Sequence, residues 1–330
     1  MPRILVAPDS FKGTYDAFSV TARVAQGIRA AGGEALEAPL ADGGEGTLAV
    51  LQSALGGQLQ KVDVTGPLGQ VVSGHFLMTD DGQTAVVETA TASGLQLMPT
   101  QGRDAWRATS RGTGELISHA VAAGVREVWL GVGGSASTDG GLGAIEAISE
   151  AGGLGDVRLH VICDVRTPFE LAADVFAPQK GADQRTVLRL RERLELLART
   201  LPRNPRGIPR TGAAGGLAGG LWAVYDAELH PGIETVMEMV GFASLAASVD
   251  VVVTGEGCLD EQTREGKVVS GVTVVCQELG IPVHAIVGRC LLGSAEWTTM
   301  GLTSVTEAST AEDQVAAGRA LMDELFNSRS

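Results

Sequence analysis

Short apolar runs alternate with helical patterns at both ends of this chain, and the alternation limits the folds that it can adopt. The N-terminal run RILVAPD predicts a strand, and residues 19–31 follow as a helical pattern that stops at a glycine pair. EALEAPL predicts a second strand, and Leu48, Leu51 and Leu55 mark a second helix. Such alternation is typical of an α/β fold with a largely parallel sheet.

The middle of the chain has a different pattern. KVDVTGPLGQVVSGHFLM and TAVVET are strand-like runs joined by turn residues, which indicates an antiparallel segment. Strand, helix and strand return in VDVVVTGEG, residues 270–279 and IPVHAIVG, and Ser309-x-x-Glu312 predicts a capping box at the start of a last helix. We therefore expect residues 61–239 to form an inserted domain, and residues 1–60 and 240–330 to share one sheet.

Composition and charge exclude several classes of function. The 330 residues are 44% hydrophobic, which is enough for a sizeable core. A formal net charge of -14 argues against nucleic acid or an anionic membrane as a partner, although a local group of cations and backbone amides can still bind a small anion. The first ten residues are too short and too quickly polar for a secretory signal, so we expect a cytoplasmic protein with no membrane span. The four cysteines lie far apart, and we expect neither a disulfide framework nor a cysteine zinc site.

The stretch GVGGSASTDGG, residues 131–141, follows the apolar run VREVWL. Its glycines carry no side chains that would obstruct a phosphate, and a helix is expected to begin near Thr138. These features predict an anion site that includes Gly133, Gly134, Ser135 and Asp139.

Charged and glycine-rich segments also follow the other predicted strands. Because open α/β sheets bind ligands at the carboxyl ends of their strands, these segments are candidate site residues. The first two strands lead into PDSFKG and ADGGEG, which contribute Asp9, Ser10, Lys12, Asp42, Gly43, Gly44 and Glu45. The segment ATSRGTGELI begins a helix and forms a predicted anion site with Ser110, Arg111 and Thr113.

Two further clusters combine carboxylates with cations. VTGEGCLDEQTREGK places Glu256, Asp260 and Lys267 after a strand, a mixture suited to binding magnesium and a polyphosphate together. CDV and PQKGA contribute Asp164, Gln179 and Lys180.

Neither of the two common phosphate-binding motifs describes these segments. Gly131-x-Gly133-x-x-Ala136 fits a dinucleotide fingerprint, but the acidic residue expected about 20 positions later at a strand end is poorly supplied, since Glu150 lies at a predicted helix end. The P-loop pattern fails because Gly266-Lys267 lacks the upstream glycine and is followed by a valine.

Eight motifs in order resemble those of the bacterial glycerate kinases that phosphorylate D-glycerate at the 2-hydroxyl. They are APDSFKG, ADGGEGT, TSRGTGELI, GGSASTDGG, CDV, PQKGA, GAAGGL and TGEGCLDEQTREGK, and they run through nearly the whole chain. The resemblance implies an α/β fold in which a discontinuous, flavodoxin-like parallel-sheet domain, residues 1–60 and 240–330, carries an inserted mixed α/β domain, residues 61–239. It also implies an active site in the cleft between them.

The resemblance implies ATP as co-substrate with Mg²⁺, D-glycerate as acceptor, and direct in-line transfer of the γ-phosphoryl group. Lys12, Arg111, Lys180 and Lys267 would neutralise the carboxylate and the phosphates, and Asp42 or Asp164 would orient or deprotonate the attacking hydroxyl. Glu256 or Asp260 would hold the metal, directly or through water. The remaining candidates would bind substrate or phosphate, and a homodimer is compatible with the pattern.

The chain departs from the family pattern at a few positions. Ser137-Thr138 stands where Thr-Asn is usual, Cys258 where arginine is usual, and Thr167 where asparagine is usual. Three alternatives remain open: phosphorylation of the 3-hydroxyl, a sensor that binds a nucleotide or hydroxy acid without turnover, and a nicotinamide dehydrogenase. The carboxylates beside the cations argue against a sensor, because binding of anions alone would not favour extra negative charge.

Overall fold

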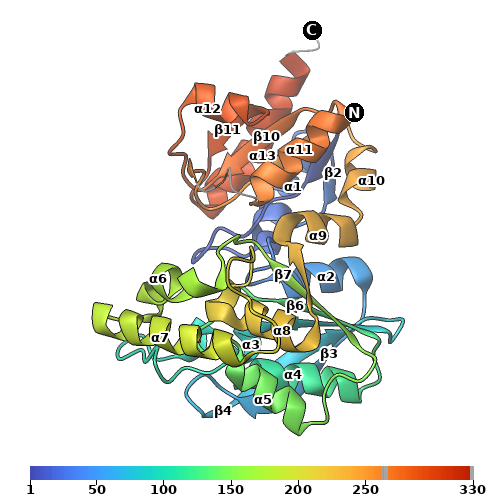
Figure 1. Ribbon diagram of the computed structural model, residues 1–330. Helices are drawn as coiled ribbons and strands as arrows, with labels where there is room; N and C mark the ends of the chain where they lie inside the picture. The colour runs from blue at the N-terminus through green and yellow to red at the C-terminus, as the bar shows by residue number, and fades with distance from the viewer. Residues whose placement is uncertain (262, 264–266, 328–330) are drawn as a thin grey trace. The chain divides into compact units, whose positions relative to one another are not determined.

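The chain forms two compact units in a computed structural model that describes residues 1–261, 263 and 267–327. Unit 1 comprises residues 1–42 and 232–330, and unit 2 comprises residues 43–231. The chain therefore leaves unit 1 after Asp42 and returns to it at Gly232. Figure 1 shows the course of the chain within each unit.

Unit 1 contains a parallel sheet whose order, within the described residues, is β2-β1-β9-β10-β11. Its strands are β1 (Arg3–Val6), β2 (Glu34–Glu37), β9 (Val251–Thr254), β10 (Val283–Val287) and β11 (Leu302–Glu307). Its helices are α1 (Ala17–Ala30), α9 (Gly232–Met239), α10 (Phe242–Ala246), α11 (Val268–Leu279), α12 (Ser294–Thr299) and α13 (Ala311–Asn327). Numbered within the unit, the strand order is 2-1-3-4-5, which is the flavodoxin-like order.

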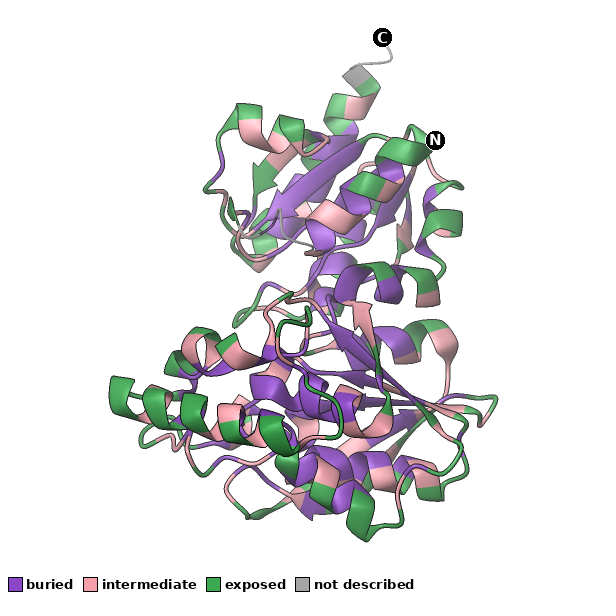
Figure 2. Cartoon of the chain, in the orientation of Figure 1, coloured by how far each residue is buried: buried purple, intermediate pink, exposed green. Residues whose placement is uncertain are grey.

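Both faces of this sheet are covered by helices. Successive residues of a strand point to opposite faces, so Leu5 packs in one core with Phe242 and Val269 from α10 and α11. Ile4 packs in the other core, with helices α1 and α13. Burial on both faces explains why the three central strands, β1, β9 and β10, are almost continuously apolar (Figure 2).

Unit 2 is built on a mixed sheet of order β3-β4-β5-β6-β7-β8. β3, β4 and β5 pair antiparallel, as the sequence predicted for this region, whereas β5 to β8 pair in parallel. The strands are β3 (Gln58–Thr65), β4 (Val71–Met78), β5 (Thr84–Glu88), β6 (Glu127–Gly131), β7 (Arg158–Cys163) and β8 (Glu228–Pro231).

Helices α4, α5 and α8 pack on one face of this sheet and form its main core. The α-helices are α2 (Thr47–Leu55), α3 (Thr89–Ser93), α4 (Arg111–Ala122), α5 (Leu142–Glu150), α6 (Ala172–Phe176), α7 (Gln184–Thr200) and α8 (Leu217–Tyr225). The 3₁₀ helices are η1 (Leu95–Leu97), η2 (Phe169–Leu171), η3 (Pro178–Lys180) and η4 (Ala213–Gly216). A smaller core joins α6 and α7.

The units divide earlier in the chain than the expected boundaries at residues 60/61 and 239/240. Helix α2 packs on β4 and β5, so it belongs to unit 2. Helix α9 packs on α10 and α11, so it belongs to unit 1. Each of these helices lies next to a point where the chain passes from one unit to the other. At such a point, a helical pattern in the sequence does not show which of the two sheets the helix covers.

Two predicted helix starts are displaced. Helix α5 begins at Leu142 rather than near Thr138, because the backbone is still left-handed at Gly140 and Gly141. At the last helix, the reciprocal cap joins Thr310 and Asp313, whose side chains each accept the other's backbone N–H at 3.1 Å. This pair lies one residue after the predicted Ser309-x-x-Glu312 box. Within the described residues, no helix is both long and apolar enough to cross a membrane.

The packing of α1 against α13 gives a test of the fold of unit 1. A Cβ atom on Gly27 would lie 2.0 Å from the backbone oxygen of Val315. Gly27→Ala should therefore destabilise unit 1 by about 2 kcal/mol, since overpacking outweighs the helix propensity of alanine. We expect thermal melts of the full chain to show a midpoint lowered by roughly 5 °C. Gln26→Ala, at the exposed neighbouring position, is the control, and equal midpoints for the two variants would contradict the packing.

Candidate active site

The carboxyl ends of β1, β2 and β9 bring three of the predicted segments together in unit 1. These strands are neighbours in the sheet. The chain stays paired beyond β1 and β9, because the backbone N–H of Asp9 donates to the carbonyl of Gly255 at 2.8 Å. A Cβ atom on Gly257 would lie 3.2 Å from the backbone nitrogen of Lys12, so a side chain there would crowd the turn after β1. The segments after β1 and β9 therefore lie against each other.

The segments after β1 and β2 carry an ion pair and a buried carboxyl group. Lys12 Nζ lies 3.4 Å from Asp42 Oδ2, and the lysine side chain is 70% exposed while the aspartate is buried. Burial and, to a lesser extent, the negative charge of Asp42 together raise the pKa of Asp9 to about 7. The backbone N–H of Ser10 donates to Asp9 Oδ1 at 2.6 Å. This edge of the sheet therefore concentrates negative charge beside a cation that reaches solvent.

The segment after β9 places a lysine between two carboxylates. Lys267 Nζ lies 3.6 Å from Glu256 Oε2 and 3.7 Å from Asp260 Oδ1. Thr263 Oγ1 donates to Glu256 Oε1 at 2.6 Å. Burial raises the pKa of Glu256, while the Thr263 hydrogen bond and Lys267 favour its charged form. All three predicted residues of this cluster thus meet at one point of unit 1.

In unit 2, the two glycine-rich turns pack directly on each other. The backbone N–H of Gly133 donates to the carbonyl of Gly43 at 3.3 Å, and a Cβ atom on Gly133 would lie 2.3 Å from the Cα of Gly44. Gly43 has a φ of +90°, and its Cβ would meet Ile162. Gly134 has a φ of +68°, and its carbonyl accepts from Leu95. These glycines are needed for a close approach of two backbones.

The carboxylate of Glu88, which was not among the predicted site residues, lies at the start of helix α2. Glu88 Oε1 accepts the backbone N–H of Leu48 at 3.1 Å, at the helix that follows the exposed Glu45. Burial raises the pKa of Glu88 to about 7, even though the backbone hydrogen bonds from Leu48 and Gly46 favour its charged form. The sequence held a signal for this residue, because it is a single carboxylate that ends the apolar run TAVVE.

Asp139 occupies the starts of two helices. Its Oδ2 accepts from both the backbone N–H and the hydroxyl of Ser110 at 2.8 Å, at the start of α4. The same carboxylate accepts the backbone N–H groups of Gly141 and Gly143 at 3.2 and 3.3 Å, at the start of α5. Asp139 is therefore an anion from the protein itself at the helix starts where a bound anion was predicted.

Arg111 and Thr113 at the start of α4 also have internal partners. Arg111 Nε lies 3.0 Å from Glu115 Oε1, and its Nη2 lies 2.5 Å from Glu150 Oε2. The hydrogen bond that the Arg111 guanidinium donates to Glu150 raises the pKa of the guanidinium. Thr113 Oγ1 donates to the hydroxyl of Ser93 at 3.0 Å. Glu150 lies at a helix end, where it cannot serve as the acidic residue of a dinucleotide-binding motif. Its partner is instead Arg111, which was predicted to bind an anion.

Lys180 is fully buried beneath the loop that follows β6. Its Nζ donates to Ser135 Oγ at 2.9 Å and to the carbonyl of Ser137 at 2.5 Å, and burial lowers its pKa to about 7. The buried hydroxyls of Ser137 and Thr138 have no hydrogen-bond partner among the described residues. Because buried polar groups are normally hydrogen-bonded, these two hydroxyls are among the exceptions in the described structure.

The two other predicted residues of unit 2 lie near the ends of their elements. Asp164 follows β7 directly and is half-buried. Gln179 is exposed on η3, and its carbonyl accepts from Arg103 Nη1 at 3.4 Å.

Comparison with known proteins identifies the family of this chain. The sequence profile described as Glycerate kinase family matches residues 4–151 and 151–326. A protein named Glycerate kinase from Halalkalibacterium halodurans is 38% identical over 325 residues, covering 87% of this chain and 86% of the relative. A protein named Glycerate 2-kinase from Escherichia coli is 36% identical, covering 87% and 85%.

A solved structure described as a candidate glycerate kinase 2 from Salmonella typhimurium LT2 superposes with a TM-score of 0.84 at 33% identity, covering 99% of both chains. The chain belongs to the glycerate kinase family. It is therefore a kinase, and its two-unit α/β fold matches that of a structural neighbour from the same family.

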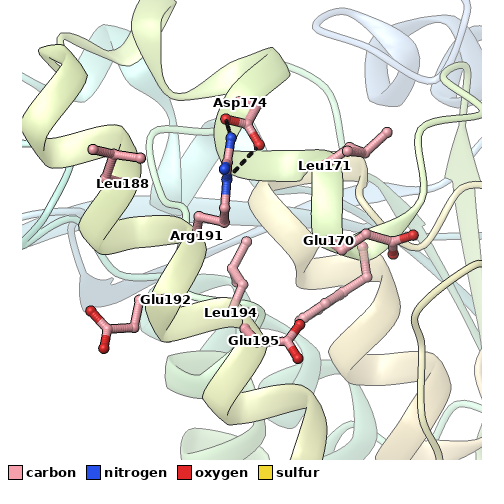
Figure 3. Close-up of a pocket in the computed structure, with 9 residues that line it drawn as sticks. Glu170, Leu171, Asp174, Leu188, Arg191, Glu192, Leu194 and Glu195 are labelled. Carbon is pink, nitrogen blue, oxygen red and sulfur yellow. Dashed lines mark hydrogen bonds and ion pairs between the residues drawn. The ribbon is translucent and has the colours of Figure 1, made fainter.

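A pocket of about 550 Å³ lies elsewhere in unit 2, between η2 and α6 on one side and α7 on the other (Figure 3). Arg191 is the one cation among the residues that line this pocket. Its side chain points to Asp174, and its Nε donates to Asp174 Oδ2 at 3.0 Å. The other charged residues of the pocket are Glu170, Glu192 and Glu195. A pocket with this lining is unsuited to the anionic substrates of a kinase, and none of the predicted site residues lines it.

The burial of Lys180 predicts a pH dependence of stability. Its pKa of about 7 in the folded protein is below the value in the unfolded chain, so between pH 7 and about 10 the unfolded chain binds a proton that the folded one does not. The free energy of unfolding of the native chain, relative to Lys180→Met, should therefore rise with pH in this window, by at most about 1.4 kcal/mol per pH unit. Urea unfolding at pH 7, 8 and 9 measures the slope.

Lys61→Met is the matched control, because Lys61 is exposed on β3 of the same unit. The free energy of unfolding of Lys61→Met should change with pH at the same slope as that of the native chain. If Lys180→Met and the native chain gave parallel curves of stability against pH, Lys180 would not be buried as a low-pKa amine.

Proposed function

We propose that this member of the glycerate kinase family transfers the γ-phosphoryl group of ATP to the 2-hydroxyl of D-glycerate. The observation that carries the proposal is the charged edge of unit 1, where Lys267 lies between two carboxylates at the end of β9. Such a mixture suits a metal-bound polyphosphate better than a simple anion. The name of the Escherichia coli relative, Glycerate 2-kinase, supports the choice of hydroxyl.

The cations of the chain would neutralise charge. Lys12 and Lys267 are the best placed, because both lie at strand ends of unit 1 and each is within 4 Å of a carboxylate that fixes its position. Phosphoryl transfer needs little covalent help from the protein, so such positioning and charge neutralisation account for most of the catalysis. Arg111 is held by Glu115 and Glu150, so we assign it to positioning helix α4 rather than to the substrate.

Unit 2 would contribute the loop from Ser135 to Thr138. Lys180 holds this loop from beneath through Ser135 and the carbonyl of Ser137. The buried hydroxyls of Ser137 and Thr138 have no protein partner in the described structure, and they would hydrogen-bond a hydroxy-acid substrate. Because the family usually has Thr-Asn here, this loop is where we expect the chain's substrate preference to differ.

The oxygen donors of unit 1 fit a magnesium ion. Mg²⁺ prefers carboxylate, water and phosphate oxygens, and Glu256 and Asp260 lie together at one strand end beside a polyphosphate-binding lysine. Burial raises the pKa of Glu256, so a cation beside it would favour its charged form. When bound, the ion would offset the negative charge of the phosphates.

A carboxylate of the chain would accept the proton of the attacking hydroxyl. Asp42 and Asp164 both follow strands and are candidates for this role. Asp9 is a third, because a pKa of about 7 suits proton transfer near neutral pH.

Phosphorus NMR of the products tests the reaction. Purified protein with D-glycerate and Mg-ATP should form ADP and 2-phosphoglycerate, and neither should form when the acceptor or the metal is left out. Exclusive formation of 3-phosphoglycerate would reverse the assignment of the hydroxyl. If a series of hydroxy acids produced no ADP, the protein would be a sensor rather than a catalyst.

Asp260→Asn tests the charged edge of unit 1. An amide keeps the shape and one acceptor oxygen but removes the charge that attracts Mg²⁺, so turnover should fall by about 10² to 10³-fold. The measurement is steady-state turnover across a magnesium titration, with a thermal melt to show that the fold is intact. Asp323→Asn, an exposed carboxylate on α13, is the matched control and should keep full turnover. Near-normal turnover of Asp260→Asn at low Mg²⁺ would move the metal role to Glu256.

A further inference from the structure

Two histidines and a glutamate converge on one face of the unit 2 sheet, within β7 and β8. His160 Nδ1 lies 3.0 Å from His230 Nε2. Glu228 Oε2 lies 3.7 Å from the first of these nitrogens and 3.6 Å from the second. Among the described residues, this is the group of histidine, cysteine and acidic side chains whose ligand atoms are close enough to share a metal ion.

The strand register produces this convergence. His160 pairs with Glu228 across the parallel β7–β8 ladder, and His230 lies two residues further along β8. Since alternate residues of a strand share a face, all three side chains project from the same side of the sheet. Their neighbours Val161 and Leu229 point to the opposite face, into the core formed with α4, α5 and α8. The cluster is therefore built into the sheet rather than assembled from loops.

The distances fit metal coordination. Three atoms separated by 3.0, 3.6 and 3.7 Å can all lie about 2.0 to 2.1 Å from one ion, which is the usual length of zinc–nitrogen and zinc–oxygen bonds. A hydrogen bond between the two imidazoles accounts for the shortest distance alone. It leaves unexplained why Glu228 Oε2 is nearly equidistant from the two nitrogens and beyond hydrogen-bond length from both.

The surroundings hold the first ligand in place. Trp129 on β6 pairs in register with His160, and their rings stack with centroids 4.2 Å apart (strands β6 and β7 in Figure 1). The His160 side chain is only 7% exposed, whereas His230 is 27% and Glu228 60% exposed. One ligand is thus rigid and buried, and the other two reach the surface, so a water molecule can complete the coordination.

We propose that His160, Glu228 and His230 bind one zinc ion, with water as the remaining ligand. Two imidazoles and one carboxylate are the donors of many three-ligand zinc sites, and imidazole nitrogen discriminates against magnesium. This site is separate from the oxygen donors of unit 1. Because β8 is the edge strand of the sheet, the ion would fasten that edge to β7 and so stabilise unit 2.

The test uses the full chain after treatment with a chelator and dialysis, titrated with zinc chloride in a calorimeter. We expect one equivalent to bind. His230→Gln and Glu228→Gln should each weaken the affinity by more than about 100-fold, because even the loss of an outer partner of a metal ligand costs about 10- to 100-fold. At a zinc concentration 100 times the Kd, the melting temperature should rise by roughly 5 °C in the native chain and not in the variants.

His119→Gln is the matched control, since His119 is exposed on α4 of the same unit and lies outside the cluster; it should bind zinc like the native chain. Titration with Co²⁺ distinguishes the ligands, because cysteine would add a thiolate charge-transfer band that this site should lack. Because Glu228 is largely exposed, Glu228→Gln keeps the test valid even if His230→Gln fails to fold. Absence of saturable binding, equal affinity in Glu228→Gln and the native chain, or a thiolate band would each overturn the proposal.

Discussion

The arrangement of unit 2 depends on the carboxylate of Asp139. It accepts hydrogen bonds at the starts of α4 and α5, where unpaired backbone N–H groups would otherwise need an anion or water. By joining Ser110 to Gly141 and Gly143, it fixes the path of the chain between β6 and α5. The loop from Ser135 to Thr138 lies on this path, and Lys180 holds the same loop from beneath.

The convergence of the strand ends in unit 1 could be predicted from sequence. Asp9 and Lys12 follow one apolar run, Asp42 the next and Glu256 a third, and the carboxyl ends of neighbouring parallel strands share an edge. The class of fold and the antiparallel start of the second sheet followed from periodicity in the same way. These features depend on local pattern, which a single sequence contains.

The internal partners of unit 2 could not be predicted in this way. Arg111 pairs with Glu150 across 39 positions, and Leu48 donates to Glu88 across 40. An arginine or a glycine-rich turn beside a helix start has the same local sequence whether its partner is a substrate or a distant carboxylate.

The displaced cap at the start of α13 has a different cause. Two overlapping capping boxes are possible there, Ser309 with Glu312 and Thr310 with Asp313, and only the backbone geometry selects the second.

The two crossings of the chain between units have a consequence for how the protein folds as it is synthesised. Residues 43–231 are continuous, so unit 2 can fold as soon as they have left the ribosome. In unit 1, β1 lies between β2 and β9, and Ile4 pairs with Val251. The N-terminal strands must therefore wait, with their apolar faces uncovered, until nearly the whole chain has been made. The sheet of unit 1 can therefore be completed only late in synthesis, and the whole of unit 2 lies in the loop that must be closed. Until then the uncovered strands can aggregate or bind chaperones.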